Sequence, residues 1–177
     1  MELLDRYEKL KQKVVERKDS FNRFLGILES ETTWLISPAS TRFHLAEERG
    51  LLKHSVGVAE TLLRFREFLA PAISEESCVI VGLLHDVGKL GMPGKPLYLP
   101  NENEWMVKNR GIRYKINPEV VDMGLAVRSL SIVAIIEPVF FAVMKPAQRA
   151  QKQSWTPLSK RHFHLLFGVN ILLFLRQ

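Results

Sequence analysis

The stretch Ser74-Glu-Glu-Ser-Cys-Val-Ile-Val-Gly-Leu-Leu-His-Asp-Val-Gly-Lys-Leu-Gly91 predicts a helix that ends in a pair of polar side chains. The Ser74 hydroxyl can accept hydrogen bonds from free amides at a helix start, and the two glutamates after it favour the positive end of the helix dipole. Apolar residues continue the helix to His85 and Asp86, and Gly88 ends it. An imidazole and a carboxylate therefore lie side by side at a helix end.

The His85-Asp86 pair is suited to bind a divalent cation. The residues that follow, 88–96, are rich in glycine and proline, so we expect an irregular, flexible loop that lets both side chains turn toward one ion. Neutral imidazole and carboxylate together suit Mn, Fe, Ni, Zn or Mg in a mixed nitrogen and oxygen site.

His54 is the candidate third ligand. It lies in Gly50-Leu-Leu-Lys-His-Ser-Val-Gly-Val-Ala59, on a second predicted helix, where the small residues Gly57 and Ala59 would let a neighbouring helix pack closely. The alternative for His54, taken alone, is a buried core histidine with one satisfied hydrogen bond, because most buried polar groups serve packing rather than metal binding.

Helical periodicity covers most of the remaining chain. Apolar residues recur every three or four positions over residues 1–30, which predicts one or two amphipathic helices. Further helices are expected over residues 51–69, from Pro118 to Ile136 and over residues 158–175. The last of these is apolar enough to belong to the core or to the seam of a homodimer.

One short segment has the pattern of strands. Over residues 104–116, two runs with apolar and aromatic residues flank Asn109-Arg-Gly111, which predicts a β-hairpin with glycine at its turn. No internal repeat or low-complexity linker divides the sequence. We therefore expect one all-α domain with a small β-hairpin insertion near residues 104–116.

Composition places the chain among ordinary globular proteins. It has 177 residues, 46% of them hydrophobic and 25% charged, which suffices for one domain with its own core. The single cysteine, Cys78, excludes an intramolecular disulfide, and with the acidic N-terminal segment it indicates a reducing, cytoplasmic location. The longest nearly uncharged runs, 130–144 and 163–175, fall short of the roughly 20 residues that span a bilayer, so we expect buried helices there.

The candidate ligands resemble a known arrangement. Gly50-Leu-Leu-Lys-His54-Ser-Val and Leu83-Leu-His85-Asp86-Val-Gly-Lys89 resemble the first two motif elements of the HD superfamily of metal-dependent phosphohydrolases, a lone histidine and a His-Asp pair on neighbouring helices. The stretch Pro38-Ala-Ser-Thr-Arg-Phe-His44-Leu-Ala-Glu-Glu-Arg-Gly-Leu-Leu52 is similar to the lead-in of bacterial and phage HD proteins, some of which are similar to 3′-to-5′ exoribonucleases. The tract around Trp105 and the segment 123–130 resemble the insertion and the following helix of the same group.

This resemblance covers residues 34–133 of one domain that spans residues 1–177. Residues 1–30 add an N-terminal helix, and residues 134–177 form a divergent helical C-terminus. The implied fold is an HD-type helical bundle.

The resemblance also implies a reaction. One divalent metal, held by His54, His85 and Asp86, would lower the pKa of a bound water and polarise a phosphoryl oxygen. The implied enzyme is a phosphohydrolase that cleaves a phosphoester of a phosphorylated small molecule, such as a nucleotide, or of a nucleic acid. Asp86 and Lys89 are its catalytic residues, and Lys89 offsets the charge that develops on the phosphate.

Three residues are expected to contact the substrate. They are His44, Lys89 and Arg128, and His44 has a second role open to it as a ligand of a second metal. The alternatives are that His44 is a plain surface histidine and that Lys89 is a solvated loop lysine.

The sequence departs from the family pattern in its last part. The family's fourth ligand is an aspartate on a late helix, whereas here Asp122 is the one aspartate after Asp86 and does not match that position. Leu125 stands where relatives commonly have a histidine. Residues 131–177 carry 6 Lys and Arg against 1 acidic residue, Glu137, whereas residues 1–130 carry 19 against 18.

Three explanations fit this departure: a divergent pair of helices, the loss of a ligand in an inactive relative, or an altered reading frame. Two functions therefore compete with hydrolysis. One is a catalytically degenerate HD-scaffold module that binds a nucleotide, a nucleic acid or a protein partner. The other, ranked last, is a nucleic-acid binder that uses the basic C-terminal segment.

Overall fold

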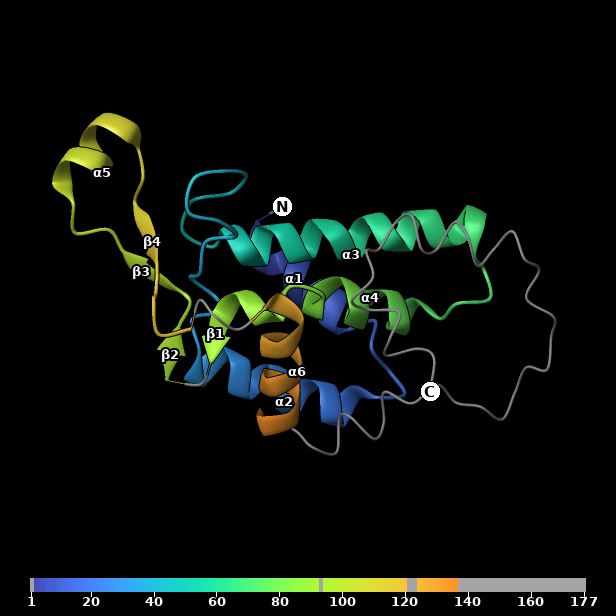
Figure 1. The fold of residues 1–177 in the computed structure, drawn as a ribbon. Helices are drawn as coiled ribbons and strands as arrows, with labels where there is room; N and C mark the ends of the chain where they lie inside the picture. The colour runs from blue at the N-terminus through green and yellow to red at the C-terminus, as the bar shows by residue number, and fades with distance from the viewer. Residues whose placement is uncertain (1, 93, 121–123, 137–177) are drawn as a thin grey trace.

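The computed structural model describes residues 2–92, 94–120 and 124–136, which form a helical bundle with a projecting arm (Figure 1). The elements in chain order are α1 (Leu3–Lys11), α2 (Lys18–Glu31), α3 (Gly50–Leu69), α4 (Glu75–Leu84), a short 3-10 helix η1 (Val87–Leu90), β1 (Gly91–Met92), β2 (Lys95–Pro96), β3 (Tyr98–Pro100), α5 (Glu104–Arg110), β4 (Tyr114–Ile116) and α6 (Leu125–Ile136). The expected all-α fold with a small two-stranded insertion is confirmed. None of the helices in these ranges is long and apolar enough to cross a membrane.

Helices α3 and α4 run side by side and antiparallel through the centre of the bundle (Figure 1). Their contact is tightest at Gly82, where an added Cβ would lie 2.4 Å from Ala59 Cα. The prediction that small residues on α3 let a neighbouring helix approach is therefore confirmed for Ala59. It is wrong for Gly57, where an added Cβ would meet no atom within 4 Å.

The N-terminal periodicity resolves into two helices, α1 and α2, joined by a turn. Glu76 on α4 anchors this turn, because its carboxylate accepts hydrogen bonds from the backbone N–H groups of Val15, Glu16 and Arg17 and pairs with the Arg17 guanidinium. The buried core beneath is built from aromatic and aliphatic side chains; its largest fully buried members include Tyr7, Phe21, Phe24, Trp34, Leu51, Leu52 and Ile80.

Helix α4 begins as its sequence predicts and ends earlier than predicted. The Ser74 hydroxyl accepts a hydrogen bond from the Ser77 N–H at 3.1 Å, and the regular helix stops at Leu84, directly before His85. The capping hydroxyl is a local signal, so sequence alone locates the start of this helix. The expected end at Gly88 is wrong, because Gly88 lies inside η1.

The arm that projects from the bundle is β3–α5–β4 (Figure 1). An antiparallel strand pair is present, but it joins Tyr98–Pro100 to Tyr114–Ile116, so the predicted first strand, Trp105-Met-Val-Lys108, is wrong. These residues lie in helix α5. The Asn103 side chain accepts from Met106 N–H at its start, and Gly111 closes it at φ 65°, a conformation that glycine adopts without strain.

The glycine-rich run after the His-Asp pair is more regular than predicted. It forms η1 and then the short antiparallel pair β1–β2. Gly88 is needed for packing, because an added Cβ there would lie 2.5 Å from both Leu125 O and Ser129 Oγ of α6. The start of the run, η1, is thus packed against α6, so the expected irregular structure is wrong there. The predicted helix over 158–175 lies outside the described residues, as do Asp122 and Glu137.

Candidate metal centre

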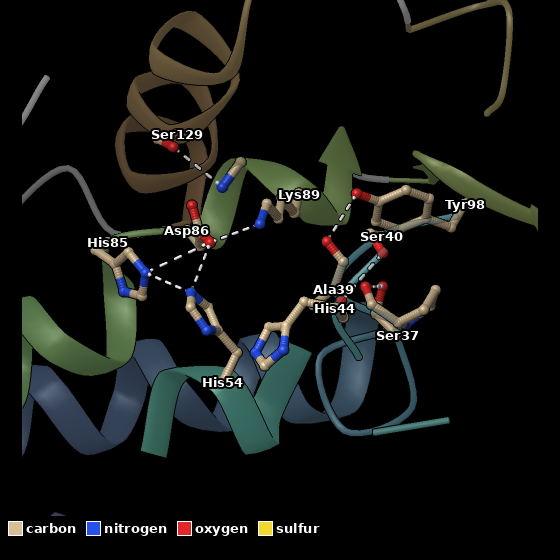
Figure 2. Close-up of polar contacts among 12 residues, drawn as sticks. Ser37, Ala39, Ser40, His44, His54, His85, Asp86, Lys89, Tyr98 and Ser129 are labelled. Atoms are coloured by element: carbon tan, nitrogen blue, oxygen red, sulfur yellow. Dashed lines mark hydrogen bonds and ion pairs between the residues drawn. The ribbon is translucent and has the colours of Figure 1, made fainter. Parts of the chain in front are cut away.

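Three side chains from two neighbouring helix ends meet at one point (Figure 2). His54 comes from the first turns of α3, His85 follows the last residue of α4, and Asp86 precedes η1. The His54 and His85 Nε2 atoms lie 3.1 Å apart. Asp86 Oδ2 lies 3.3 Å from His54 Nε2 and 3.4 Å from His85 Nε2. Within the described ranges, this trio forms a group able to hold a metal ion.

These separations fit a bound transition metal. A metal about 2.0–2.2 Å from each ligand atom spaces neighbouring ligand atoms about 2.8–3.6 Å apart in octahedral or tetrahedral geometry. All three measured separations, 3.1, 3.3 and 3.4 Å, fall in that interval. Two imidazole nitrogens and one carboxylate oxygen are also a donor set that suits Zn, Fe, Mn or Ni.

The orientation of His85 is fixed by the backbone of its own helix. Its Nδ1 lies 2.8 Å from the carbonyl oxygen of Gly82 and donates its proton there, since a carbonyl can only accept. The neutral ring then carries its lone pair on Nε2, the atom that faces His54 and Asp86. This arrangement is typical of metal-ligating histidines, because the outer hydrogen bond selects the tautomer and orients the ring.

Asp86 is held as a carboxylate. It is buried, which by itself would raise its pKa, but the hydrogen bond from His54 and the ammonium of Lys89 outweigh burial and hold the pKa of this carboxyl well below its usual value. Lys89 Nζ lies 2.7 Å from Asp86 Oδ2. The lysine predicted to assist the reaction therefore reaches the same oxygen as the two histidines.

His44 lies on the opposite side of His54 from His85 (Figure 2). Its ring stands edge-on to the His54 ring with the centroids 5.7 Å apart, and the residue is exposed. The loop that carries it is closed by the Ala39 N–H, which donates to Leu45 O at 3.0 Å. It lies so close to the start of α3 that a Cβ on Gly50 would sit 2.0 Å from Leu45 O.

Arg128 lies buried beneath the site. Its guanidinium donates to the carbonyl oxygens of Gly88 at 2.8 Å and Val120 at 3.3 Å. Together with Ser129, whose hydroxyl accepts from Gly88 N–H at 3.1 Å, it ties α6 to the turn after Asp86. Contact between Arg128 and a substrate stays a prediction.

Sequence reasoning missed Tyr98 and Ser129. The Tyr98 hydroxyl donates to Ala39 O at 3.2 Å and so links the arm to the His44 loop (Figure 2). Burial, helped by the negative charge of Asp86, raises the pKa of this hydroxyl, which keeps it a donor. No local pattern marks either residue, because both contacts join segments at least 40 residues apart in the chain.

A pocket of about 510 Å³ opens beside the centre along one face of α3. His44 and His54 line one end, and the lining continues past Gly57 and Thr61 to Phe65. His54 thus belongs both to the ligand trio and to the pocket wall.

Comparison with known proteins agrees with this geometry. The family model described as HD domain matches residues 51–151, which is more than half of the chain and includes His54, His85 and Asp86. Searches of curated proteins and of solved structures gave no match. The two elements that define such a domain, a lone histidine on one helix and a His-Asp pair at the end of its neighbour, are brought within 3.4 Å of one another here. The chain therefore belongs to the HD-domain family, within the superfamily of metal-dependent phosphohydrolases.

Proposed function

We propose that the protein is a metal-dependent phosphohydrolase that cleaves a phosphoester of a nucleotide or a nucleic acid with a metal-activated water. The observation that carries the proposal is the spacing of the ligand trio, His54, His85 and Asp86, at 3.1–3.4 Å. A divalent metal bound there would act as a Lewis acid on a phosphoryl oxygen and lower the pKa of a bound water.

The residues of the chain divide the remaining work. Asp86, held ionised by its neighbours, supplies the negative charge that attracts a cation into the site. Gly82 holds the His85 ring through its carbonyl, so that Nε2 keeps its lone pair toward the centre. These contacts orient the ligands before a metal arrives, which lowers the cost of binding.

Lys89 is the proposed partner of the phosphate. Its side chain is 26% exposed, so part of it is accessible to solvent while its ammonium reaches Asp86. A cation in that position stabilises negative charge that grows on phosphoryl oxygens in the transition state. His44, exposed beside His54, is the second proposed substrate contact, and Arg128 is a third.

The experiment that tests this proposal measures metal content and turnover together. Protein purified without chelator is analysed by elemental mass spectrometry, beside a His85→Ala/Asp86→Ala variant and an Asp19→Ala control that removes an exposed carboxylate from α2. Nucleotides and short oligonucleotides are then screened for phosphate release or cleavage with Mn, Mg, Ni and Zn. We expect metal near one equivalent and turnover in the wild type and the control, and neither in the double variant.

Other outcomes separate the alternatives. Metal without turnover of any substrate would contradict the proposed reaction and favour a degenerate HD-scaffold module that binds a ligand or a partner. A wild type that neither retains nor takes up metal would contradict the metal centre itself. A cytoplasmic location and a homodimer stay predictions.

A further inference from the structure

The pocket along α3 begins at His54, a proposed metal ligand, and extends away from the ligand trio. Beyond His54, its floor is the face of α3 formed by residues at helical spacing, Gly57, Val58, Thr61 and Phe65. Its volume of about 510 Å³ lies within the range of small-molecule sites, about 300–1,000 Å³. A substrate whose phosphate reaches the metal centre therefore has room for the rest of the molecule on this side.

The chemistry of the floor is apolar. Gly57 has no side chain and exposes the backbone of α3 in the pocket. An added Cβ there would meet no atom of the described residues within 4 Å. The neighbouring Thr61 hydroxyl donates to the Gly57 carbonyl at 2.8 Å and so presents its methyl group and not a free donor. Lys53 at the rim is paired with Glu47 at 2.9 Å, which balances its charge. The pocket therefore suits an uncharged, apolar group better than a second phosphate or a polyol, whose hydroxyls would lose their hydrogen bonds to water.

The walls favour a flat group. His44 and Phe65 both line the pocket, and among the described residues Phe65 is half-exposed, so its ring is accessible to a ligand. Aromatic rings gain most from stacked or edge-on contact with another ring. A nucleobase combines a flat apolar face with a fixed link, through its sugar, to a phosphate.

We propose that this pocket binds the base of a nucleoside phosphate whose phosphate lies at the metal centre, and that His44 and Phe65 contact that base. The position of the phosphate in this inference rests on the proposed function. The inference adds that the substrate is a nucleotide or the end of a nucleotide chain, and that the absence of a side chain at Gly57 makes room for its base.

Gly57 also provides the test, because a leucine there would fill the pocket. Gly26 on α2 supplies the matched control: it too lies inside a helix, is exposed, and has no atom within 4 Å of an added Cβ. Both Gly→Leu changes improve helix propensity, so neither is expected to lower the melting temperature. Gly57→Ala, a smaller obstruction, gives a graded third variant.

The measurement is isothermal titration calorimetry in the presence of Mn²⁺, with the 5′- and 3′-monophosphates of adenosine as probes and ribose 5-phosphate as the base-free comparison. We expect wild type and Gly26→Leu to bind one adenosine monophosphate at least about tenfold more tightly than ribose 5-phosphate, and Gly57→Leu to lose that preference. Gly57→Ala should fall between them.

Two results would overturn the inference. One is a wild type with no preference for an adenosine monophosphate over ribose 5-phosphate, including no binding of either. The other is a folded Gly57→Leu protein that binds the adenosine monophosphate as Gly26→Leu does. Failure of the proposed function looks different: the nucleotide binds through the pocket but no metal supports its hydrolysis. If hydrolysis proceeds and Gly57→Leu leaves its KM unchanged, the pocket inference fails alone.

Discussion

Gly82 on α4 packs directly against Ala59 on α3, so closely that a methyl group on Gly82 would lie 2.4 Å from Ala59 Cα and 2.7 Å from its Cβ. The same Gly82 accepts the Nδ1 proton of His85 through its carbonyl oxygen. One residue without a side chain thus sets the distance between the two helices that carry the ligands and orients one of the ligands. The approach of His54 to His85 is a consequence of this contact.

Replacing Gly82 by alanine should therefore weaken both the fold and the metal centre. The new methyl group has to push α3 away from α4, and overpacking of this kind costs about 1–3 kcal/mol of unfolding free energy. Since the displacement falls on the helix that carries His54, we also expect Mn²⁺ or Zn²⁺ affinity to fall. Chemical denaturation and calorimetric metal titration measure the two effects. Gly26→Ala, at an open helical position, should change neither, and a Gly82→Ala protein with wild-type metal affinity would disprove the link.

Lys89→Met should separate metal binding from catalysis. The ammonium lies 2.7 Å from Asp86 Oδ2 and so competes with a cation for that oxygen. Its removal should tighten Mn²⁺ binding by about tenfold or less, because one nearby positive charge is lost. The same change should lower kcat by about 10²–10³-fold if Lys89 stabilises the phosphate. Lys89→Arg keeps the charge and should retain part of the activity. Unchanged kcat in Lys89→Met would contradict the catalytic role of Lys89 and leave it as the ion-pair partner of Asp86.

Glu76→Gln should destabilise the protein in a pH-dependent way. Burial opposes the charge of this carboxylate, but hydrogen bonds from Arg17 and from the Val15 amide prevail and lower its pKa below the usual value. A carboxyl whose pKa is lower in the folded state contributes stability that is present above its unfolded pKa, about 4.3, and is lost as the pH falls through the folded value.

The wild type should therefore exceed Glu76→Gln by about 1–3 kcal/mol at pH 7, and the difference should shrink below about pH 4. Urea denaturation at several pH values measures it. Glu75→Gln is the neighbouring control: its exposed pair with Lys13 should contribute less than about 1 kcal/mol at any pH. A difference for Glu76→Gln that stays constant with pH would argue against the role of its charge.

Arg128→Gln tests whether this buried arginine holds the fold or the substrate. The shorter side chain cannot reach the carbonyls of Gly88 and Val120 as the guanidinium does, so we expect a loss of about 1–3 kcal/mol. Thermal and urea unfolding give that loss, and steady-state kinetics give KM. A variant with wild-type stability and a raised KM would assign Arg128 to the substrate.

Local information in the sequence predicted most of the helices. Helix α4 begins at the expected serine cap, and α3 covers Gly50–Leu69 where residues 51–69 were expected. Periodicity and caps suffice for these helices, since they act within one or two turns. The candidate ligands His54, His85 and Asp86 rested on the resemblance to the HD superfamily, and the structure brings the three side chains together.

The wrong prediction of a strand where α5 lies also has a cause within that segment. Residues 104–110 have aromatic and apolar residues typical of a strand, but the Asn103 cap and the left-handed Gly111 favour a helix, and no residue of α5 is buried. With no buried face to impose a pattern, hydrogen bonds at the ends decided the structure. The strand pair then formed from the segments on either side.

Only the tertiary structure shows which segment packs against each glycine. The sequence indicates Gly88 as a helix end and predicts nothing for Gly82, yet each glycine marks a backbone contact with a segment more than 20 residues away in the chain, at Leu125 and at Ala59. At Gly57, by contrast, an added Cβ would meet no atom of the described residues within 4 Å, and the pocket stays open there. The sequence shows that a glycine has no side chain. Which segment packs against it depends on how the helices pack, and contacts between residues distant in the chain determine that packing.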